Sequence, residues 1–473
     1  MILRDAEKNL NDWLRRKNRK PLIIRGARQV GKSTLVRLFS KNCGQTLCEI
    51  NLERHPFLEP VFRSMDLPAI LRELSSLARA DILEEGSLLF LDEIQAVPSA
   101  IAALRYFYEE YPRLPVIAAG SLLEFALAGK AFSMPVGRVE FLHLSPLSFG
   151  EYLGALDAAR LAELRVCLRE GQGCIPATLH RELLRHQRSY LAVGGMPEVV
   201  QSQLEGGRVE AQRVQDSILS TYVEDFSKYA RQEQLARLQK IFNGCARMVG
   251  RKVKYARLSE GDGTREVKAA LDLLARAGVI HRVVHTQAGG LPLGAETKEH
   301  VFKLLFLDSG LLCRMLGLDA RSMEVLSEIQ LVNEGPLAEQ FVGQQLLSRQ
   351  RTGLKPELFY WLREGRSVNA EVDFVIAHGG RVLPAEVKAG TSGSLRSLLQ
   401  FNHARDNRLA LRFDLNLPSY HEHVHGIVTP EGAVEVHLDL LSLPLYLAEF
   451  LDEGLALREK WQQPAKDGDE VGA

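Results

Sequence analysis

The sequence predicts an α/β protein whose N-terminal part is a parallel sheet with helices on both faces. From residue 21 to about residue 153, short apolar runs alternate with helix-forming stretches, as in strands joined by crossover helices. The run at 87–91 is continuously apolar rather than alternating, which is typical of a strand buried on both faces. After residue 154 the apolar periodicity becomes helical, and strand patterns return at 279–284.

A glycine-rich loop follows the first apolar strand. Residues 26–33 read G-x-x-x-x-G-K-S between the strand at 22–25 and a helix-forming stretch at 35–39, which is the strand–loop–helix context of a P-loop. Gly26 and Gly31 permit backbone turns that a Cβ forbids, so that successive N–H groups converge on phosphate oxygens. A glycine-rich turn beside a helix is the alternative, but the flanking strand and helix favour a nucleotide site at the positive end of the helix dipole.

The P-loop predicts which residues hold the nucleotide and its metal ion. We expect the nucleoside triphosphate to contact Gly26, Ala27, Arg28, Gln29, Val30, Gly31, Lys32, Ser33 and Thr34. Lys32 is expected to reach the β- and γ-phosphates, and the Ser33 hydroxyl is expected to bind Mg²⁺. The chain has no N-K-x-D signature for guanine, which favours ATP over GTP.

Two carboxylates end the buried run at 87–91. Asp92 is placed to hold Mg²⁺ through water, and Glu93 is placed to orient or deprotonate the attacking water. In isolation, a strand that ends in Asp-Glu is often only a solvated strand end. Because a P-loop precedes this strand in the chain, we favour a role for both carboxylates in hydrolysis.

Two later residues are candidates for sensing or stabilising the γ-phosphate. An apolar strand at 114–120 ends at Ser121, a polar residue at the end of the strand expected beside the run at 87–91. Arg138 stands just before the apolar strand at 139–144 and is a candidate sensor or finger arginine. A surface arginine is the alternative for Arg138.

Length and composition fit a soluble chain of several domains. At 473 residues, the chain predicts about three domains, and its 46% hydrophobic and 25% charged residues are ordinary for globular proteins. Its 59 basic residues balance 59 acidic ones, so net charge does not indicate nucleic-acid binding, although local patches stay open. The six cysteines include no C-x-x-C pair, which argues against a zinc ribbon or a secreted disulfide scaffold. A charged N-terminus and the lack of a long apolar stretch predict a cytoplasmic protein with no membrane partner.

The middle of the chain is predicted to be helical. Residues 154–250 form the helical region, and residues 251–330 form a winged-helix-like region in which Thr264 caps a helix at 265–277. A helix-turn-helix of this kind often enters a DNA major groove, which makes DNA a candidate partner. Many such units serve only as packing or protein-contact modules, and the cations Arg265, Lys268 and Arg276 do not decide between these roles.

An acidic constellation is predicted in residues 331–451. Asp373 lies on a strand at 371–376, and Glu386 and Lys388 end the returning strand of a β-hairpin. Glu386 and Lys388 share one face of that strand, and Glu339 lies on a preceding helix. Such a set forms the site of PD-(D/E)xK nucleases, in which Asp373, Glu386 and Glu339 would hold Mg²⁺ and Lys388 would stabilise the developing charge. E-x-K alone is a weak motif, and degenerate members of this fold bind without cutting.

The order of these motifs resembles a prokaryotic family of AAA-type ATPases of the archaeal-ATPase-like group. The markers that carry the resemblance are at 26–34, 91–93, 120–121, 137–138, 144–149, 190–198, 303–311 and 371–390. The resemblance implies a P-loop ASCE/AAA-type domain over 1–153 and a C-terminal domain of unknown function with a restriction-endonuclease-like core. It also implies a homo-oligomer. A polar tail at 462–473 is expected to be disordered.

Two functions remain open from the sequence. In the first, the nucleotide state of an ATP-hydrolysing protein controls a Mg²⁺-dependent nuclease that acts on DNA. In the second, the chain is an ATP-driven switch whose C-terminal domain binds nucleic acid or protein without cleavage.

Overall fold

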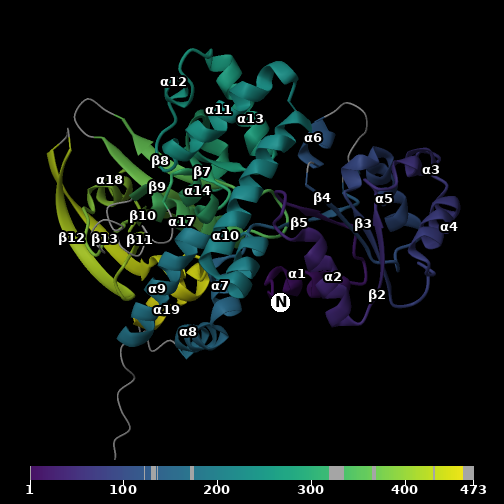
Figure 1. Ribbon diagram of the computed structural model, residues 1–473. Coiled ribbons are helices and arrows are strands. Elements are labelled where there is room, and N and C mark those ends of the chain that lie inside the picture. The colour runs from purple at the N-terminus through teal and green to yellow at the C-terminus, as the bar shows by residue number, and fades with distance from the viewer. Residues whose placement is uncertain are drawn as a thin grey trace, which may run out of the picture.

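The N-terminal part of the chain is a five-stranded parallel sheet. The computed structural model describes residues 2–121, 123–128, 135, 137–170, 175–228, 230–318, 335–364, 369–429 and 432–461, so the expected tail at 462–473 lies outside the described residues. The strands are β1 (Leu22–Arg25), β2 (Thr46–Asn51), β3 (Ser87–Asp92), β4 (Val116–Gly120) and β5 (Glu140–His143). They lie in the order β2-β3-β4-β1-β5 with parallel neighbours, and we call them the N-terminal sheet (Figure 1).

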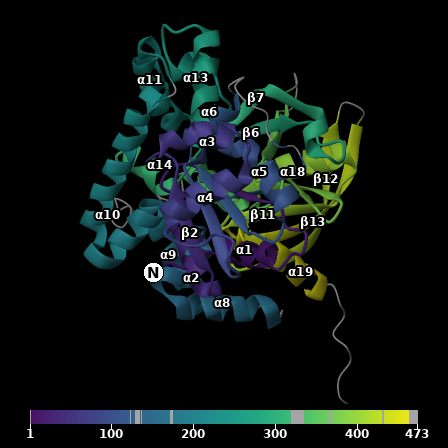
Figure 2. The ribbon, with the colours of Figure 1, turned by 90° about the vertical axis from the view of Figure 1, so that its right-hand side faces the viewer.

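Helices cover both faces of the N-terminal sheet. They are α1 (Ala6–Leu14), α2 (Lys32–Cys43), α3 (Glu59–Arg63), α4 (Leu67–Ala78), α5 (Pro98–Glu110) and α6 (Leu123–Ala128), and α3, α4 and α5 lie toward the viewer in Figure 2. Alternate residues of β3 enter different apolar cores, since Leu88 and Phe90 join one core and Leu89 and Leu91 join the other. This alternation explains the continuously apolar run and confirms the predicted parallel sheet flanked by helices.

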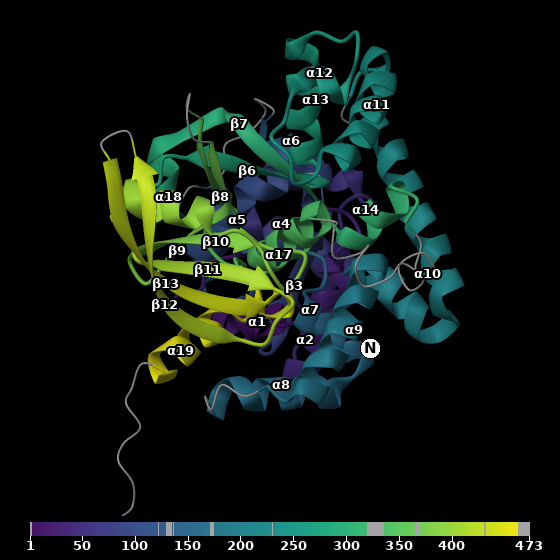
Figure 3. The same cartoon turned by 90° about the vertical axis from the view of Figure 1, so that its left-hand side faces the viewer.

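A set of helices follows the N-terminal sheet. These are α7 (Phe149–Leu156), α8 (Ala158–Glu170), α9 (Ala177–Val193), α10 (Pro197–Asp225), α11 (Gln232–Met248), α12 (Tyr255–Leu258) and α13 (Thr264–Arg276). Helix α10 is interrupted at Gly207, where the backbone adopts a φ of 75° and a ψ of −167°. Helices α11, α12 and α13 form one end of the molecule (Figures 1 and 3). No helix among the described residues is both long enough and apolar enough to span a membrane.

A second, mixed sheet occupies the C-terminal part. Its eight strands are β6 (Ile280–Thr286), β7 (Thr297–Phe306), β8 (Leu358–Arg363), β9 (Ala370–His378), β10 (Arg381–Val387), β11 (Leu409–Asp414), β12 (Ser419–Thr429) and β13 (Gly432–Pro444). Their order is β12-β13-β11-β10-β9-β8-β6-β7, and we call them the C-terminal sheet (Figure 3). The helices α14 (Ser309–Met315), α17 (Gly335–Ser348), α18 (Arg396–Arg405) and α19 (Leu451–Trp461) accompany it. The antiparallel pair β9 and β10 is the hairpin that the sequence predicts.

The C-terminal sheet crosses the domain boundary expected at residue 330. Strand β6 pairs in parallel with β8, with Val283 opposite Leu358, so the strands of the expected winged-helix region belong to the same sheet as the expected nuclease-like strands. Helix α13 also begins at Thr264, and its N-cap is Gly263 without a side-chain cap, so Thr264 is not the cap. The two regions expected as separate domains therefore share one β-structure.

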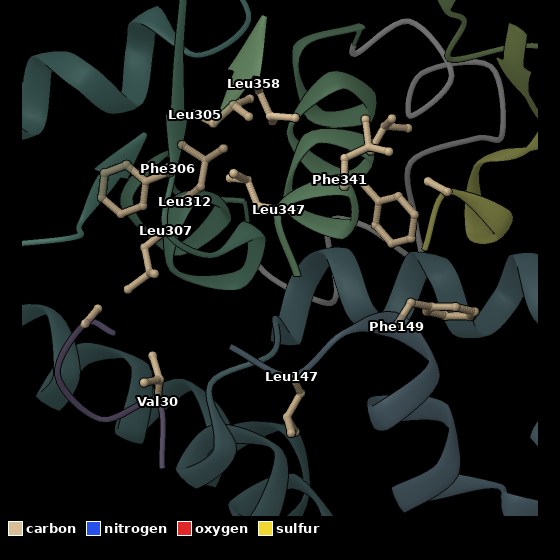
Figure 4. Close-up of a cluster of buried hydrophobic side chains, with 14 of the residues drawn as sticks. Val30, Leu147, Phe149, Leu305, Phe306, Leu307, Leu312, Phe341, Leu347 and Leu358 are labelled. Atoms are coloured by element: carbon tan, nitrogen blue, oxygen red, sulfur yellow. The ribbon is translucent and has the colours of Figure 1, made fainter. Parts of the chain in front are cut away.

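One continuous apolar core joins the two sheets. Val30 of the P-loop, Leu147 after β5, and Phe341 and Leu347 of α17 belong to the same buried cluster (Figure 4). A polar contact reinforces this junction, because the buried Asp308 carboxylate accepts a hydrogen bond from the Gly195 N–H at 2.6 Å. The P-loop and the C-terminal part are therefore packed against each other rather than joined by a linker.

Candidate nucleotide site and carboxylate cluster

The P-loop has the backbone that the sequence predicts. Strand β1 ends at Arg25, and α2 begins at Lys32 directly after Gly31, whose φ is 90°. Gly26 has a φ of 156°, and a Cβ there would lie 2.3 Å from the Leu144 carbonyl oxygen. Both the close approach to Leu144 and the left-handed turn at Gly31 therefore require glycine.

Lys32 is buried at the mouth of this loop. Its Nζ donates hydrogen bonds to the carbonyl oxygens of Gly26 at 3.1 Å and Ala27 at 2.8 Å. Burial lowers the pKa of Lys32 to about 8, while the carboxylates of Glu93 and Asp92 oppose this shift. A phosphate in the loop would offer this ammonium anionic oxygens, which are stronger acceptors than the two carbonyls.

Ser33 and Asp92 meet although 59 residues separate them. The Ser33 hydroxyl donates to Asp92 Oδ2 at 2.9 Å. Burial raises the pKa of Asp92, and the hydrogen bond from Ser33 opposes that effect. A hydroxyl and a carboxylate in contact form an all-oxygen donor pair, which fits the preference of Mg²⁺ in a P-loop site.

Glu93 is held by two polar side chains. Its backbone adopts a φ of 51°, which is uncommon for a residue with a side chain and is frequent at functional sites. Glu93 Oε2 accepts hydrogen bonds from Gln95 Nε2 at 2.5 Å and from the Ser121 hydroxyl at 3.4 Å. Strands β3 and β4 are neighbours, so Glu93 and Ser121 lie together at their carboxyl ends. Sequence reasoning missed Gln95, although its place two residues after Glu93 is a local signal.

Arg138 lies away from the nucleotide loop of its own chain. It precedes β5, and β5 runs parallel to β1 with Glu140 opposite Leu22, so Arg138 stands at the amino end of the sheet while the P-loop stands at the carboxyl end. The exposed Arg138 guanidinium pairs with Glu109 at 2.9 Å. This position argues against the expected sensor role within the chain. A role in a neighbouring copy stays a prediction.

Residues distant in sequence fix the outer side of the P-loop. The Tyr222 hydroxyl donates to the Arg28 carbonyl at 2.8 Å, and the Arg28 guanidinium pairs with Asp225 at 2.7 Å. Arg4 Nη1 donates to the Val30 carbonyl at 2.8 Å. No motif marks Arg4, Tyr222 or Asp225, and sequence reasoning missed all three. The P-loop is thus held directly by α10 and by the segment before α1.

A cavity of about 430 Å³ adjoins the P-loop. Gly26, Ala27 and Ser121 line the wall that belongs to the N-terminal sheet, while Arg276 and His281 come from α13 and β6. Burial lowers the pKa of His281 to about 4, so this imidazole is uncharged at neutral pH. The cavity lies at the carboxyl ends of parallel strands, where α/β sheets bind ligands.

In the C-terminal sheet, a buried lysine stands at the centre of the expected acidic site. The Nζ of Lys303, on β7, lies 2.9 Å from Glu339 Oε2, 2.5 Å from Glu371 Oε1 and 3.1 Å from Asp373 Oδ1. Burial alone would lower the pKa of Lys303, but the carboxylates of Asp373, Glu339 and Glu371 together raise it well above its usual value. Lys303 is therefore a buried cation among three acids.

Glu386 and Lys388 form a second pair beside this cluster. Their side chains make an ion pair, and the second carboxylate oxygen of Glu386, Oε2, is buried without a hydrogen-bond partner among the described residues. Burial and the neighbouring Asp373 raise the pKa values of both Glu339 and Glu386 to about 8. We call Lys303, Lys388, Glu339, Glu371, Asp373 and Glu386 the carboxylate cluster.

The carboxylate cluster places two lysines among the acids of the expected metal site. The structure brings Glu339 and Asp373 together as predicted, but around Lys303, and Lys388 is engaged with Glu386. Among the described residues, no three acidic, histidine or cysteine side chains are arranged to hold a metal ion. Sequence reasoning missed Lys303, although a lysine inside the apolar run 301–307 was a signal.

A comparison with protein families matches the part of the chain that contains the P-loop. Residues 18–153 match the family model described as AAA domain. This part of the chain is therefore similar to AAA domains. Residues 184–322 and 334–420 match two models described as domains of unknown function, DUF8612 and DUF4143. The 18–153 match ends within α7 and gives no activity to the C-terminal sheet.

The other comparisons add little. The solved structure of C. elegans PCH-2 is similar at 12% identity, over 49% of this chain and 64% of that chain, with a TM-score of 0.25. The likeness thus spans less than two thirds of the PCH-2 chain, and at this TM-score it carries no argument. No curated protein matches the chain.

Proposed function

We propose that the chain binds ATP with Mg²⁺, hydrolyses it, and uses the nucleotide state to control what its C-terminal part binds. The observation that carries the proposal is the contact between Ser33 and Asp92, 2.9 Å long, beside the buried Lys32. These groups come from the loop after β1 and from the end of β3, which is the arrangement of a P-loop NTPase site.

Each side chain of the site has a role in hydrolysis. Lys32 would bind the β- and γ-phosphate oxygens, and Ser33 and Asp92 would hold Mg²⁺, which neutralises charge on the phosphates. Glu93 would position and deprotonate the attacking water, with Gln95 and Ser121 fixing its carboxylate. Ser121 would also contact the γ-phosphate. In a homo-oligomer, Arg138 would act on the nucleotide of a neighbouring copy.

Contacts around the P-loop would transmit a conformational change at the nucleotide site to the rest of the chain. Tyr222 and Asp225 of α10 hold Arg28, and a Cβ at Gly278, just after α13, would lie 3.3 Å from Ala27 Cβ. A shift of the P-loop on nucleotide binding would therefore act on α10 and on the turn before β6. Strand β6 belongs to the C-terminal sheet.

For the C-terminal part, Lys303 favours binding without cleavage. Its ammonium lies among the carboxylates that would otherwise hold Mg²⁺. A nuclease controlled by ATP is the second candidate. One observation favours it: four carboxylates face only two lysines, and Glu386 Oε2 has no partner among the described residues.

A cleavage assay separates the two candidates. ATP turnover and divalent-dependent cleavage of a mixed DNA panel would be measured for the wild type, Lys32→Ala and Lys388→Ala. The proposal expects turnover lost only in Lys32→Ala and no cleavage by any of the three proteins. Cleavage that Lys388→Ala abolishes and Lys32→Ala alters would instead establish the nuclease.

A further inference from the structure

A strongly basic segment joins α11 to α12. Between Arg247 and Arg257 the chain carries five cations, Arg247, Arg251, Lys252, Lys254 and Arg257, and no acidic residue in eleven positions. The whole chain is neutral, with 59 basic and 59 acidic residues, so this run is a local excess of positive charge. We call residues 247–257 the basic segment.

The middle of the basic segment, residues 249–253, is fixed against the edge of the C-terminal sheet, while Arg247 lies on α11 and Arg257 on α12. The Gly250 N–H donates to the Leu304 carbonyl at 3.1 Å, and the Val253 N–H donates to the Phe302 carbonyl at 2.9 Å. Strand β7 is the last strand of the sheet, so the segment extends that edge. Its cations are therefore displayed on a rigid support rather than on a flexible loop.

The cations of the basic segment are exposed and mostly unpaired. The side chains of Arg247, Arg251, Lys254 and Arg257 are exposed, and none of them makes an ion pair with an acid among the described residues. Only Lys252 has such a partner, Glu364. Single surface cations are usually just solvated, but a run of cations without interspersed acids gives this part of the chain a local excess of positive charge.

The basic segment passes directly beside the carboxylate cluster. Gly250 lies against α17, where an added Cβ would be 3.1 Å from Pro336 Cα and 3.5 Å from Glu339 Cδ. Lys252 is bridged to Lys303 through the backbone. A polyanion bound along the basic segment would therefore also come close to Lys303, whose positive charge offsets part of the negative charge of the carboxylate cluster.

We propose that the basic segment is a docking track for the phosphate backbone of a nucleic acid. Arginine and lysine side chains held on a sheet edge and on the two helices that flank it suit the regularly repeated phosphates of a strand or duplex. A membrane-binding surface would present exposed apolar side chains, whereas Met248 and Val249 are buried here. The inference rests on the proposed binding role of the C-terminal part and names its partner class.

The basic segment is a better candidate than the helix expected to read DNA. On α13, Arg265 and Lys268 share the helix with Glu266 and Asp272, so positive and negative charges alternate. The basic segment has no acid of its own. Phosphate contacts also set no sequence preference, so we expect binding that varies little with base sequence.

The salt dependence of nucleic-acid binding tests this proposal. Fluorescence anisotropy of labelled single-stranded and duplex DNA would be titrated with the full chain over a range of salt concentrations. The test protein combines Arg247→Ala, Arg251→Ala, Lys254→Ala and Arg257→Ala. The matched control removes four other exposed cations, with Arg15→Ala, Lys17→Ala, Arg265→Ala and Lys268→Ala.

Only the test protein is expected to lose affinity for nucleic acid. If all four cations contact phosphates of the duplex, the slope of log K against log salt becomes shallower by about 3 to 4, and affinity falls at least about tenfold. The control keeps the wild-type slope. A third protein with Arg247→Lys, Arg251→Lys and Arg257→Lys keeps the charge and the slope. It guards against misfolding as the cause of the loss.

Three results would overturn the proposal. The test protein could show the same slope as the control, or the wild type could fail to bind nucleic acid at all. The wild type could also bind phosphatidylserine vesicles or polyglutamate in preference to nucleic acid. ATP turnover measured in the same samples without nucleic acid reports separately on the proposed function, because the substituted cations lie outside the nucleotide site.

Discussion

Lys303 Nζ on β7 lies 3.1 Å from Asp373 Oδ1 on β9, although 70 residues separate the two in sequence. Both side chains are buried, and Glu339 and Glu371 complete the ring around the ammonium. The lysine occupies the place where the motif predicts a metal ion. The contact gives three of the four acids of the carboxylate cluster a shared cationic partner within the chain.

Removal of the Lys303 charge should destabilise the fold. Lys303→Met leaves the carboxylates of Glu371 and Asp373 without their shared cation, and loss of one partner of a buried ion pair costs about 3–5 kcal/mol. The midpoint of urea unfolding, followed by circular dichroism, checks this. Lys298→Met, an exposed lysine on the same strand, is the control and should change stability little. Equal midpoints for the two variants would contradict a buried charge at Lys303.

Stability should fall as pH rises through the neutral range. The folded pKa values of Glu339 and Glu386, about 8, lie above the unfolded value near ~4.3, so the folded state binds more protons between these limits. Their burial is therefore tolerated below about pH 4.3 and becomes increasingly unfavourable up to about pH 8. Glu386→Gln should flatten the dependence of the unfolding midpoint on pH, whereas the exposed Glu453→Gln should not. An unchanged slope in Glu386→Gln would count against this assignment.

The junction between the two sheets should depend on Gly195. A Cβ at this position would lie 2.1 Å from the Leu147 carbonyl oxygen and 2.8 Å from the Tyr190 hydroxyl. Gly195→Ala should therefore cost about 3 kcal/mol or more, since a buried backbone cannot yield cheaply. Gly290→Ala, where nothing lies within 4 Å of the added Cβ, is the control. Thermal unfolding of both variants gives the comparison, and a Gly195→Ala protein as stable as the control would refute the tight contact.

Gln95 should matter for turnover rather than for binding. Its amide holds Glu93 Oε2 at 2.5 Å, so Gln95→Ala should lower kcat by about tenfold to a hundredfold with little change in KM. Steady-state ATP hydrolysis measures both constants. Gln203→Ala, on α10 and far from Glu93 in sequence, serves as the control. A rise in KM with kcat unchanged would mean that Gln95 contributes to binding and not to the position of Glu93.

Local patterns in the sequence predicted the N-terminal sheet and the backbone of the loop after β1. A buried parallel strand needs a continuously apolar run, and a phosphate loop needs glycine at 26 and 31, so both leave a mark within a few residues. The same holds for the β9–β10 hairpin, whose turn is short.

Long-range pairing was not predictable in the same way. The pairing of β6 with β8 joins segments more than seventy residues apart, and the contacts of Arg4, Tyr222 and Asp225 with the P-loop depend on how whole helices pack. Neither the strand pairing nor these side-chain contacts produce a periodic pattern in a single sequence. Lys303 was predictable only in part. A lysine within an apolar strand indicates a buried charge, but it does not show which acids pair with that charge.

Hydrolysis of ATP at the P-loop is tested most directly by comparing ATP binding and turnover in Glu93→Gln, Lys32→Ala and the wild type. We expect Glu93→Gln to bind ATP with Mg²⁺ as well as the wild type but to hydrolyse it about 10²- to 10⁴-fold more slowly, and we expect Lys32→Ala to lose binding. Wild-type turnover in Glu93→Gln, or ATP binding undiminished in Lys32→Ala, would contradict the assignment of this site.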